Sequence, residues 1–156
     1  MPILYQINVS DGGVPKRPVA GAHINRDGVE GDRQADTVHH GGPDRAVCLF
    51  SLEVIKNFQA EGHPIQPGSA GENLTISGLD WDEVVPGTRL AVGEDVQLEI
   101  TSYTSPCDKN ASWFKDGEFT RMLQSRHPGE SRLYARVLSE GPVRAGDAVE
   151  VMHGSV

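Results

Sequence analysis

The stretch LYARVLSEGPVRAGDAVEVM, residues 133–152, has the pattern from which the fold class is most readily predicted. It contains two short runs, Leu133–Leu138 and Ala148–Met152, whose apolar or alternating character is typical of β-strands. Gly141 and Pro142 lie between the runs and are residues that break regular structure. The stretch therefore predicts two short strands with a break at Gly141-Pro142.

Similar runs recur along the chain between turn signals. They are Ile3–Val9, Arg45–Phe50, Asn73–Ile76, Arg89–Val92 and Val96–Thr101. Eighteen glycines and ten prolines among 156 residues exceed the usual share, so turns should be frequent and helices short. The pattern predicts a mainly β fold with short helices, of the α+β class, with its strands in a closed or nearly closed β-barrel.

Two helices are predicted from apolar spacing and capping residues. Ser51 can cap the first, whose apolar face is Leu52, Val54, Ile55 and Phe58 and which should end at Gly62. Asp116 can cap the second, with an apolar face at Phe119, Met122 and Leu123 and an end at Pro128-Gly129.

Size and charge restrict the function. A chain of 156 residues predicts one domain over residues 1–156 and excludes a two-domain enzyme with its own large cofactor domain. The net charge of −8 disfavours nucleic acid as a partner, whereas a small anionic or heterocyclic ligand could meet a local basic cluster. No signal peptide or membrane-spanning run is present, so we expect a cytoplasmic protein with no membrane partner and with both cysteines as thiols.

Cys107 is the first candidate for chemistry, because Ser105-Pro106-Cys107-Asp108 fits the start of a third helix with Ser105 as its N-cap. Free N–H groups and the helix dipole in a first turn favour a thiolate. This predicts a nucleophile or sulfur carrier; the alternative is a small apolar filler at a strand-to-helix corner. Cys48 lies inside an apolar run and is expected to be a buried strand residue.

A second candidate is GDRQ, residues 31–34, followed by HHGGPDRAV, residues 39–47. Its Gly-Gly-Pro loop, which follows the His pair and leads through Asp44 and Arg45 into a strand, could present backbone N–H groups, an imidazole and a guanidinium to an anionic or heteroaromatic ligand. The alternative is a tight turn in which Asp44 and Arg45 merely pair. A zinc site on His39 and His40 is disfavoured, because adjacent strand residues point to opposite faces and no second ligand pair has suitable spacing.

Two further groups could contact a ligand. Glu72 and Asn73 follow Gly71 at the start of a strand and could fix a polar heterocycle, although such a turn more often satisfies its own backbone. Four arginines lie within sixteen residues, at Arg121, Arg126, Arg132 and Arg136. One of them could meet a phosphate, while solvated surface positions are the default.

Five blocks occur in order: GDRQ from Gly31, HGGPDRAV from His40, GENLTISGL from Gly71, SPC from Ser105 and LYARVLSEGPVRAGDAVEV from Leu133. Together they resemble the MOSC domain, the C-terminal domain of molybdenum-cofactor sulfurases, in its small stand-alone form. The resemblance covers about residues 31–151. It implies a MOSC or pyruvate-kinase-like β-barrel and a site for the molybdenum cofactor, molybdopterin.

The resemblance also assigns residues. Cys107 falls on the family's Pro-Cys cysteine, which implies a catalytic sulfur carrier or a molybdenum ligand. The implied cofactor-binding residues are His40, Gly41, Gly42, Asp44, Arg45, Glu72, Asn73, Tyr134 and Arg136.

The resemblance also implies partner proteins, because the domains that supply sulfur or electrons in relatives have no counterpart in these 156 residues. Fused relatives carry a pyridoxal-phosphate-dependent desulfurase domain, for which 156 residues leave no room, so a separate cysteine desulfurase would have to donate sulfur. Reductase-type relatives act on N-hydroxylated substrates, and the absence of an iron–sulfur cysteine set implies a separate electron-transfer partner. Sulfur handling, a reductase component and a non-catalytic cofactor carrier are the alternatives.

Overall fold

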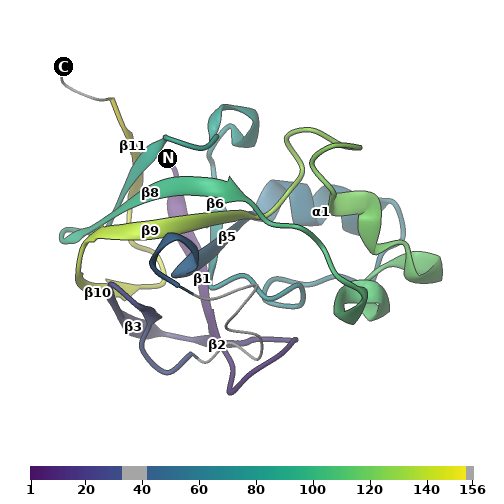
Figure 1. Ribbon diagram of the computed structural model, residues 1–156, viewed down its shortest axis with the longest axis horizontal. Coiled ribbons are helices and arrows are strands. Elements are labelled where there is room, and N and C mark those ends of the chain that lie inside the picture. The colour runs from purple at the N-terminus through teal and green to yellow at the C-terminus, as the bar shows by residue number, and fades with distance from the viewer. Residues whose placement is uncertain (33–41, 154–156) are drawn as a thin grey trace.

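The computed structural model describes residues 1–32 and 42–153, which form two β-sheets (Figure 1). The larger sheet has eight strands in the spatial order β11 (Val149–Met152), β7 (Arg89–Val92), β8 (Val96–Tyr103), β9 (Leu133–Ser139), β5 (Val47–Ser51), β6 (Leu74–Ser77), β1 (Ile3–Val9) and β2 (Arg17–Val19). The smaller sheet has the order β10 (Gly141–Arg144), β3 (Gly21–Asn25) and β4 (Gly28–Val29). The expected mainly β, α+β class is confirmed.

The helix α1 (Leu52–Ala60) connects β5 to β6, the parallel pair of the larger sheet. Parallel neighbours need such a crossover because a tight hairpin can join only antiparallel strands. Ser51 ends β5 and caps α1, since its side-chain oxygen accepts a hydrogen bond from Val54 N at 3.2 Å. The predicted apolar face of α1 is buried as expected.

The larger sheet is not closed into a complete barrel. β1 and β11 stand near opposite ends of the strand order, and one isolated bridge between Ile3 and Ala148 joins the start of β1 to the residue before β11. Two backbone hydrogen bonds reinforce this junction, from Leu4 N to Asp147 O at 2.8 Å and from Val149 N to Pro2 O at 3.0 Å. Of the closed or nearly closed barrel that was expected, full closure is not found, and within the described residues the sheet approaches closure at this junction.

The break predicted at Gly141-Pro142 is instead the start of strand β10, which pairs with β3. Proline lacks an N–H group but is tolerated in a strand that has a neighbour on one side only, as β10 does here. Strands β2, β3 and β4 were also not predicted from the sequence. They have three, five and two residues, too few for a clear alternating pattern.

The second and third predicted α-helices are wrong. The segment after Cys107 forms three 3-10 helices, η3 (Asp108–Trp113), η4 (Lys115–Gly117) and η5 (Phe119–Met122). Asp116 does not cap an α-helix, because its φ of 58° places it in the left-handed region that interrupts the helical path. Two further 3-10 turns, η1 (Pro43–Arg45) and η2 (Trp81–Glu83), precede strands β5 and β7.

The segment η3–η5 packs beside α1 at one end of the molecule (Figure 1). The Phe58 ring on α1 lies 5.8 Å from the Phe114 ring, and the Arg121 guanidinium lies over Phe58 at 4.7 Å. His63 Nδ1 accepts a hydrogen bond from Lys115 N at 2.9 Å. These contacts fix the chain that follows Cys107.

None of the helices in the described ranges, 1–32 and 42–153, is long and apolar enough to cross a membrane.

Candidate functional site

Cys107 lies in the loop between β8 and η3 as a free, partly exposed thiol. It is the residue that precedes η3, with extended backbone angles of φ −129° and ψ 168°, and its side chain makes no capping hydrogen bond. The predicted position inside the first turn of an α-helix capped by Ser105 is therefore wrong. The helical turn begins one residue later, at Asp108, and Cys107 itself is the extended residue that precedes it.

Tyr134 lies on β9 beside Cys48 of β5, its partner in the strand register. The Arg45 guanidinium lies 5.8 Å from the centre of the Tyr134 ring. Burial raises the pKa of Tyr134, and nearby charges on Cys48 and Cys107 act in the same direction, against Arg132 and Arg45. The fold thus brings Cys107, Tyr134 and Arg45 within electrostatic range, and Tyr134 remains a neutral phenol at neutral pH.

The two charged side chains of the loop at residues 42–45 contact different partners. Gly42, with φ of 93°, precedes η1, and its carbonyl accepts a hydrogen bond from Arg45 N. Arg45 faces Tyr134, whereas the Asp44 carboxylate lies 3.6 Å from Arg136 Nη1. Asp44 and Arg45 thus contact different residues and do not pair with each other as the alternative interpretation of this loop had expected. His40 and Gly41 lie outside the described residues.

Arg136 belongs to an exposed ion-pair group. Its guanidinium pairs with Glu99, which also accepts a hydrogen bond from Arg89 Nε at 3.0 Å. Hydrogen bonds from both arginines lower the pKa of Glu99. Arg136 and Asp44 therefore already have charged partners, and their assignment to cofactor binding stays a prediction.

Glu72 and Asn73 hold the backbone around the site. Glu72 is fully buried, and its Oε2 accepts hydrogen bonds from Gly68 N and Thr75 Oγ1, both at 2.9 Å. Asn73 Oδ1 accepts a hydrogen bond from Cys48 N at 3.0 Å. These contacts match the alternative in which the turn satisfies its own backbone, and cofactor binding by either residue stays a prediction.

Arg132 is the least expected of the four clustered arginines, because it is only 5% exposed. Its Nη1 and Nη2 donate to Ala70 O at 2.8 Å and Ser105 O at 3.4 Å, and its Nε has no partner. No carboxylate among the described residues forms a salt bridge with it. Through Ser105, this buried guanidinium contacts the loop that carries Cys107. The sequence marked Arg132 only as one of four, and nothing in its spacing distinguished it.

A buried ion pair supports the same region. Lys16 Nζ lies 2.7 Å from Asp32 Oδ1, and Asp32 Oδ2 accepts a hydrogen bond from Asn73 Nδ2 at 2.8 Å. Asp32 belongs to the GDRQ part of the second candidate, which gave it no separate role. For metal ions, the described ranges contain no group of three or more His, Cys, Asp or Glu side chains able to hold one, and His39 and His40 fall outside those ranges.

Wild-type protein should lose folding stability as pH rises because of Glu72, and the Glu72→Gln variant should lack this loss. Burial raises the pKa of Glu72 above the ordinary 4.5, so its favourable contribution is full below that value and is lost as pH rises through the folded-state pKa. We expect the free energy of unfolding of Glu72→Gln, relative to wild type, to increase from about pH 4 to pH 8 in urea titrations.

Glu99→Gln is the matched control, because the pKa of Glu99 is lowered and its contribution is lost as pH falls. The relative stability of that variant should change in the opposite direction. A difference between Glu72→Gln and wild type that is independent of pH would contradict the assignment.

Comparisons with known proteins agree with this architecture. The MOSC domain model matches residues 36–150. The uncharacterized protein YflK of Bacillus subtilis strain 168 is 36% identical over 142 residues, which are 90% of this chain and 63% of that protein. A protein named "Reductase" from Gibberella moniliformis is 32% identical over 130 residues, 80% of this chain and 22% of that protein. The chain thus spans less than two thirds of the length of these curated relatives.

Among solved structures, the crystal structure of YiiM from Geobacillus stearothermophilus superposes with a TM-score of 0.73 at 25% identity. The superposition covers 98% of this chain and 76% of that one. The likeness therefore extends over nearly the whole described fold.

Proposed function

The chain belongs to the MOSC domain family, and we propose that it binds the molybdenum cofactor and handles sulfur through Cys107. The observation that carries the proposal is the position of this thiol, which is free, partly exposed and within electrostatic range of Tyr134. A buried thiol could not meet a metal centre or a donor protein, and Cys48 is such a thiol.

The residues present fit a cofactor of this kind. Molybdopterin carries an anionic phosphate, and the buried guanidinium of Arg132 lacks a carboxylate partner among the described residues. The Glu72 carboxyl lies close enough to interact electrostatically with Arg132, but burial raises the pKa of Glu72 and so favours its neutral form, which leaves Arg132 able to attract an anion. Thiolate is in turn a soft ligand suited to transition metals.

Each residue then has a role. Cys107 would provide the sulfur ligand, and Arg45 and Arg132 would offset the negative charge of the cofactor. Gly42 lacks a side chain and would let the cofactor approach the backbone, and Tyr134 would offer its neutral hydroxyl. When bound, the cofactor supplies a metal centre that accepts sulfur ligands. His40, Gly41, Asp44, Glu72, Asn73 and Arg136 remain proposed contacts on the family pattern alone.

Sulfur would reach Cys107 from a separate cysteine desulfurase. The Cys107 sulfur attacks the terminal sulfur of the donor's persulfide, so that a new S–S bond forms on Cys107. The S–S bond of the donor breaks, and the donor cysteine leaves as a thiolate. The exchange is neutral in electrons, so it needs no added oxidant.

A reductase component is the second candidate. The relative from Gibberella moniliformis is named "Reductase", and this chain is similar to 22% of its length. In that role Cys107 would be a metal ligand in a protein that acts on N-hydroxylated substrates, and electrons would come from a separate partner. A cofactor carrier without turnover is a further alternative, in which the nucleophilicity of Cys107 would have no function.

The test is expression in a host that makes the molybdenum cofactor, followed by molybdenum and pterin analysis of wild type, Cys107→Ala and Cys48→Ala. We expect both signals in wild type and in Cys48→Ala, and loss of molybdenum in Cys107→Ala. Retention of pterin without molybdenum in Cys107→Ala would locate pterin binding in the loops. Absence of both signals from wild type would contradict the proposal.

A further inference from the structure

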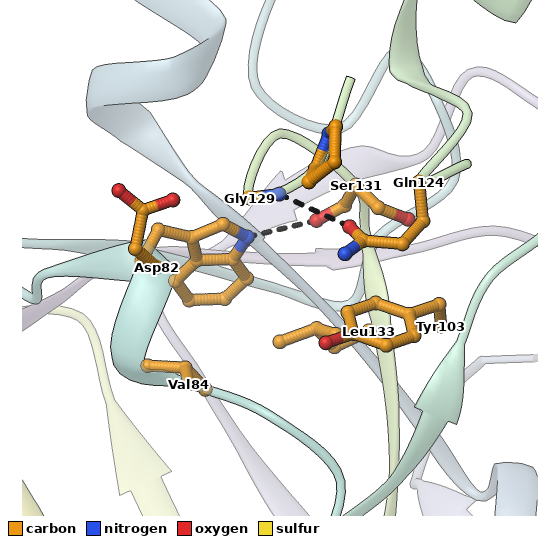
Figure 2. A pocket seen from close by; sticks show the side chains of 9 residues that line it. Asp82, Val84, Tyr103, Gln124, Gly129, Ser131 and Leu133 are labelled. Atoms are coloured by element: carbon orange, nitrogen blue, oxygen red, sulfur yellow. Dashed lines mark hydrogen bonds between the residues drawn. The ribbon is translucent and has the colours of Figure 1, made fainter. Parts of the chain in front are cut away.

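A cavity of about 120 Å³ lies between η2, the end of β8 and the start of β9 (Figure 2). It is lined by Trp81, Asp82, Val84, Tyr103, Gln124, Pro128, Gly129, Ser131 and Leu133. Leu133 faces this cavity while its neighbour Tyr134 faces Arg45, because successive strand residues point to opposite faces. The cavity is therefore separate from the Cys107 site.

Two aromatic rings and apolar side chains form the inner walls. Trp81 is held in place because its Nε1 donates to Ser131 O at 2.8 Å. The Tyr103 ring and the Leu133 side chain lie below the Gln124 amide in Figure 2. Val84 and Leu133 are buried, so the floor of the cavity is apolar.

The charge at the rim is negative. Asp82 lines the cavity beside Trp81, and its carboxylate, which lies at the outer side of the Trp81 ring in Figure 2, makes no ion pair or hydrogen bond with the described residues. It packs against Gly129, where a Cβ atom would collide with Asp82 Oδ1. No lysine or arginine is among the lining residues, so the carboxylate charge is not neutralised within the cavity.

From this combination we propose that the cavity binds a small methylated ammonium ion. The faces of tryptophan and tyrosine rings attract organic cations through their quadrupoles, and a carboxylate at the rim adds charge attraction. The volume is well below the roughly 300–1,000 Å³ of pockets for drug-sized ligands, so it suits a head group of a few atoms. This inference does not depend on the proposed function of Cys107.

Tetramethylammonium chloride is the probe, titrated into the full chain at constant ionic strength and followed by NMR of the indole N–H signals. The protein has two tryptophans, and Trp113 does not line the cavity and serves as an internal reference. We expect a saturable shift of the Trp81 signal, with a dissociation constant on the order of millimolar because few atoms make contact. The Trp113 signal should not follow the same curve.

Two controls isolate the charge. Tert-butanol, a neutral molecule of similar size, should give no saturable shift of the Trp81 signal in wild type. Asp82→Asn should weaken tetramethylammonium binding by roughly fivefold. Glu94→Gln, which removes an exposed charge at the turn between β7 and β8, should leave the affinity unchanged.

A Trp81 shift that does not saturate, or equal binding of tert-butanol, would overturn the proposal. So would an unchanged affinity in Asp82→Asn. The comparison of the two probes uses wild-type protein, so the proposal can fail even if Asp82→Asn does not fold.

Discussion

Cys107→Ser is expected to lose all transferable sulfur, whereas wild type gains the mass of one sulfur atom after incubation with a cysteine desulfurase and cysteine. A serine hydroxyl is neither nucleophilic enough nor chemically able to carry a persulfide. Cys107 is the partly exposed thiol of the two cysteines, so the whole signal should depend on it. Intact-protein mass spectrometry measures the change directly.

Cys48→Ser is the matched control. Cys48 is only 5% exposed, and burial raises its pKa, so its sulfur is a poor nucleophile at neutral pH. This variant should acquire sulfur as wild type does. Sulfur loading of Cys107→Ser equal to wild type would show that Cys107 is not the carrier.

Phe58→Ala should reduce the free energy of unfolding by about 3–5 kcal/mol, as is usual when a fully buried phenylalanine is truncated. Phe58 contacts Phe50 of β5 and Phe114 in the segment after Cys107, with ring centres 6.1 Å and 5.8 Å away. Its loss therefore opens a cavity and also removes the support of η3–η5. Urea unfolding followed by circular dichroism measures the effect.

Phe119→Ala is the comparison, because Phe119 lies on η5 and is only partly buried. It should cost clearly less than Phe58→Ala. An equal decrease in the free energy of unfolding for the two variants would show that Phe58 does not link α1 to this segment.

The parts of the fold that local sequence specifies were predictable. The cap at Ser51 and the apolar face ending at Phe58 depend on residues within one helix, and both are confirmed. The segment after Cys107 was not predictable, because His63 and Phe58 hold it from elsewhere in the chain. Those tertiary contacts, rather than helix propensity, decide its 3-10 conformation.

The candidate site shows the same limit. The family pattern identified Cys107, Arg45 and Tyr134, and the fold brings Cys107 and Arg45 within electrostatic range of Tyr134. Arg132 could not be distinguished from a surface arginine, since its hydrogen-bond partners, the carbonyls of Ala70 and Ser105, are distant in sequence. The backbone contacts of Asn73 likewise appear only when β5 and β6 pair.

The proposed function depends on contact between Cys107 and the bound cofactor. The most direct test is the rate at which iodoacetamide alkylates Cys107 in wild-type protein with and without the molybdenum cofactor, followed by peptide mapping. We predict that loading protects Cys107 and that buried Cys48 stays unmodified in both samples. Equal alkylation rates of Cys107 in the loaded and cofactor-free protein would show that Cys107 does not contact the cofactor.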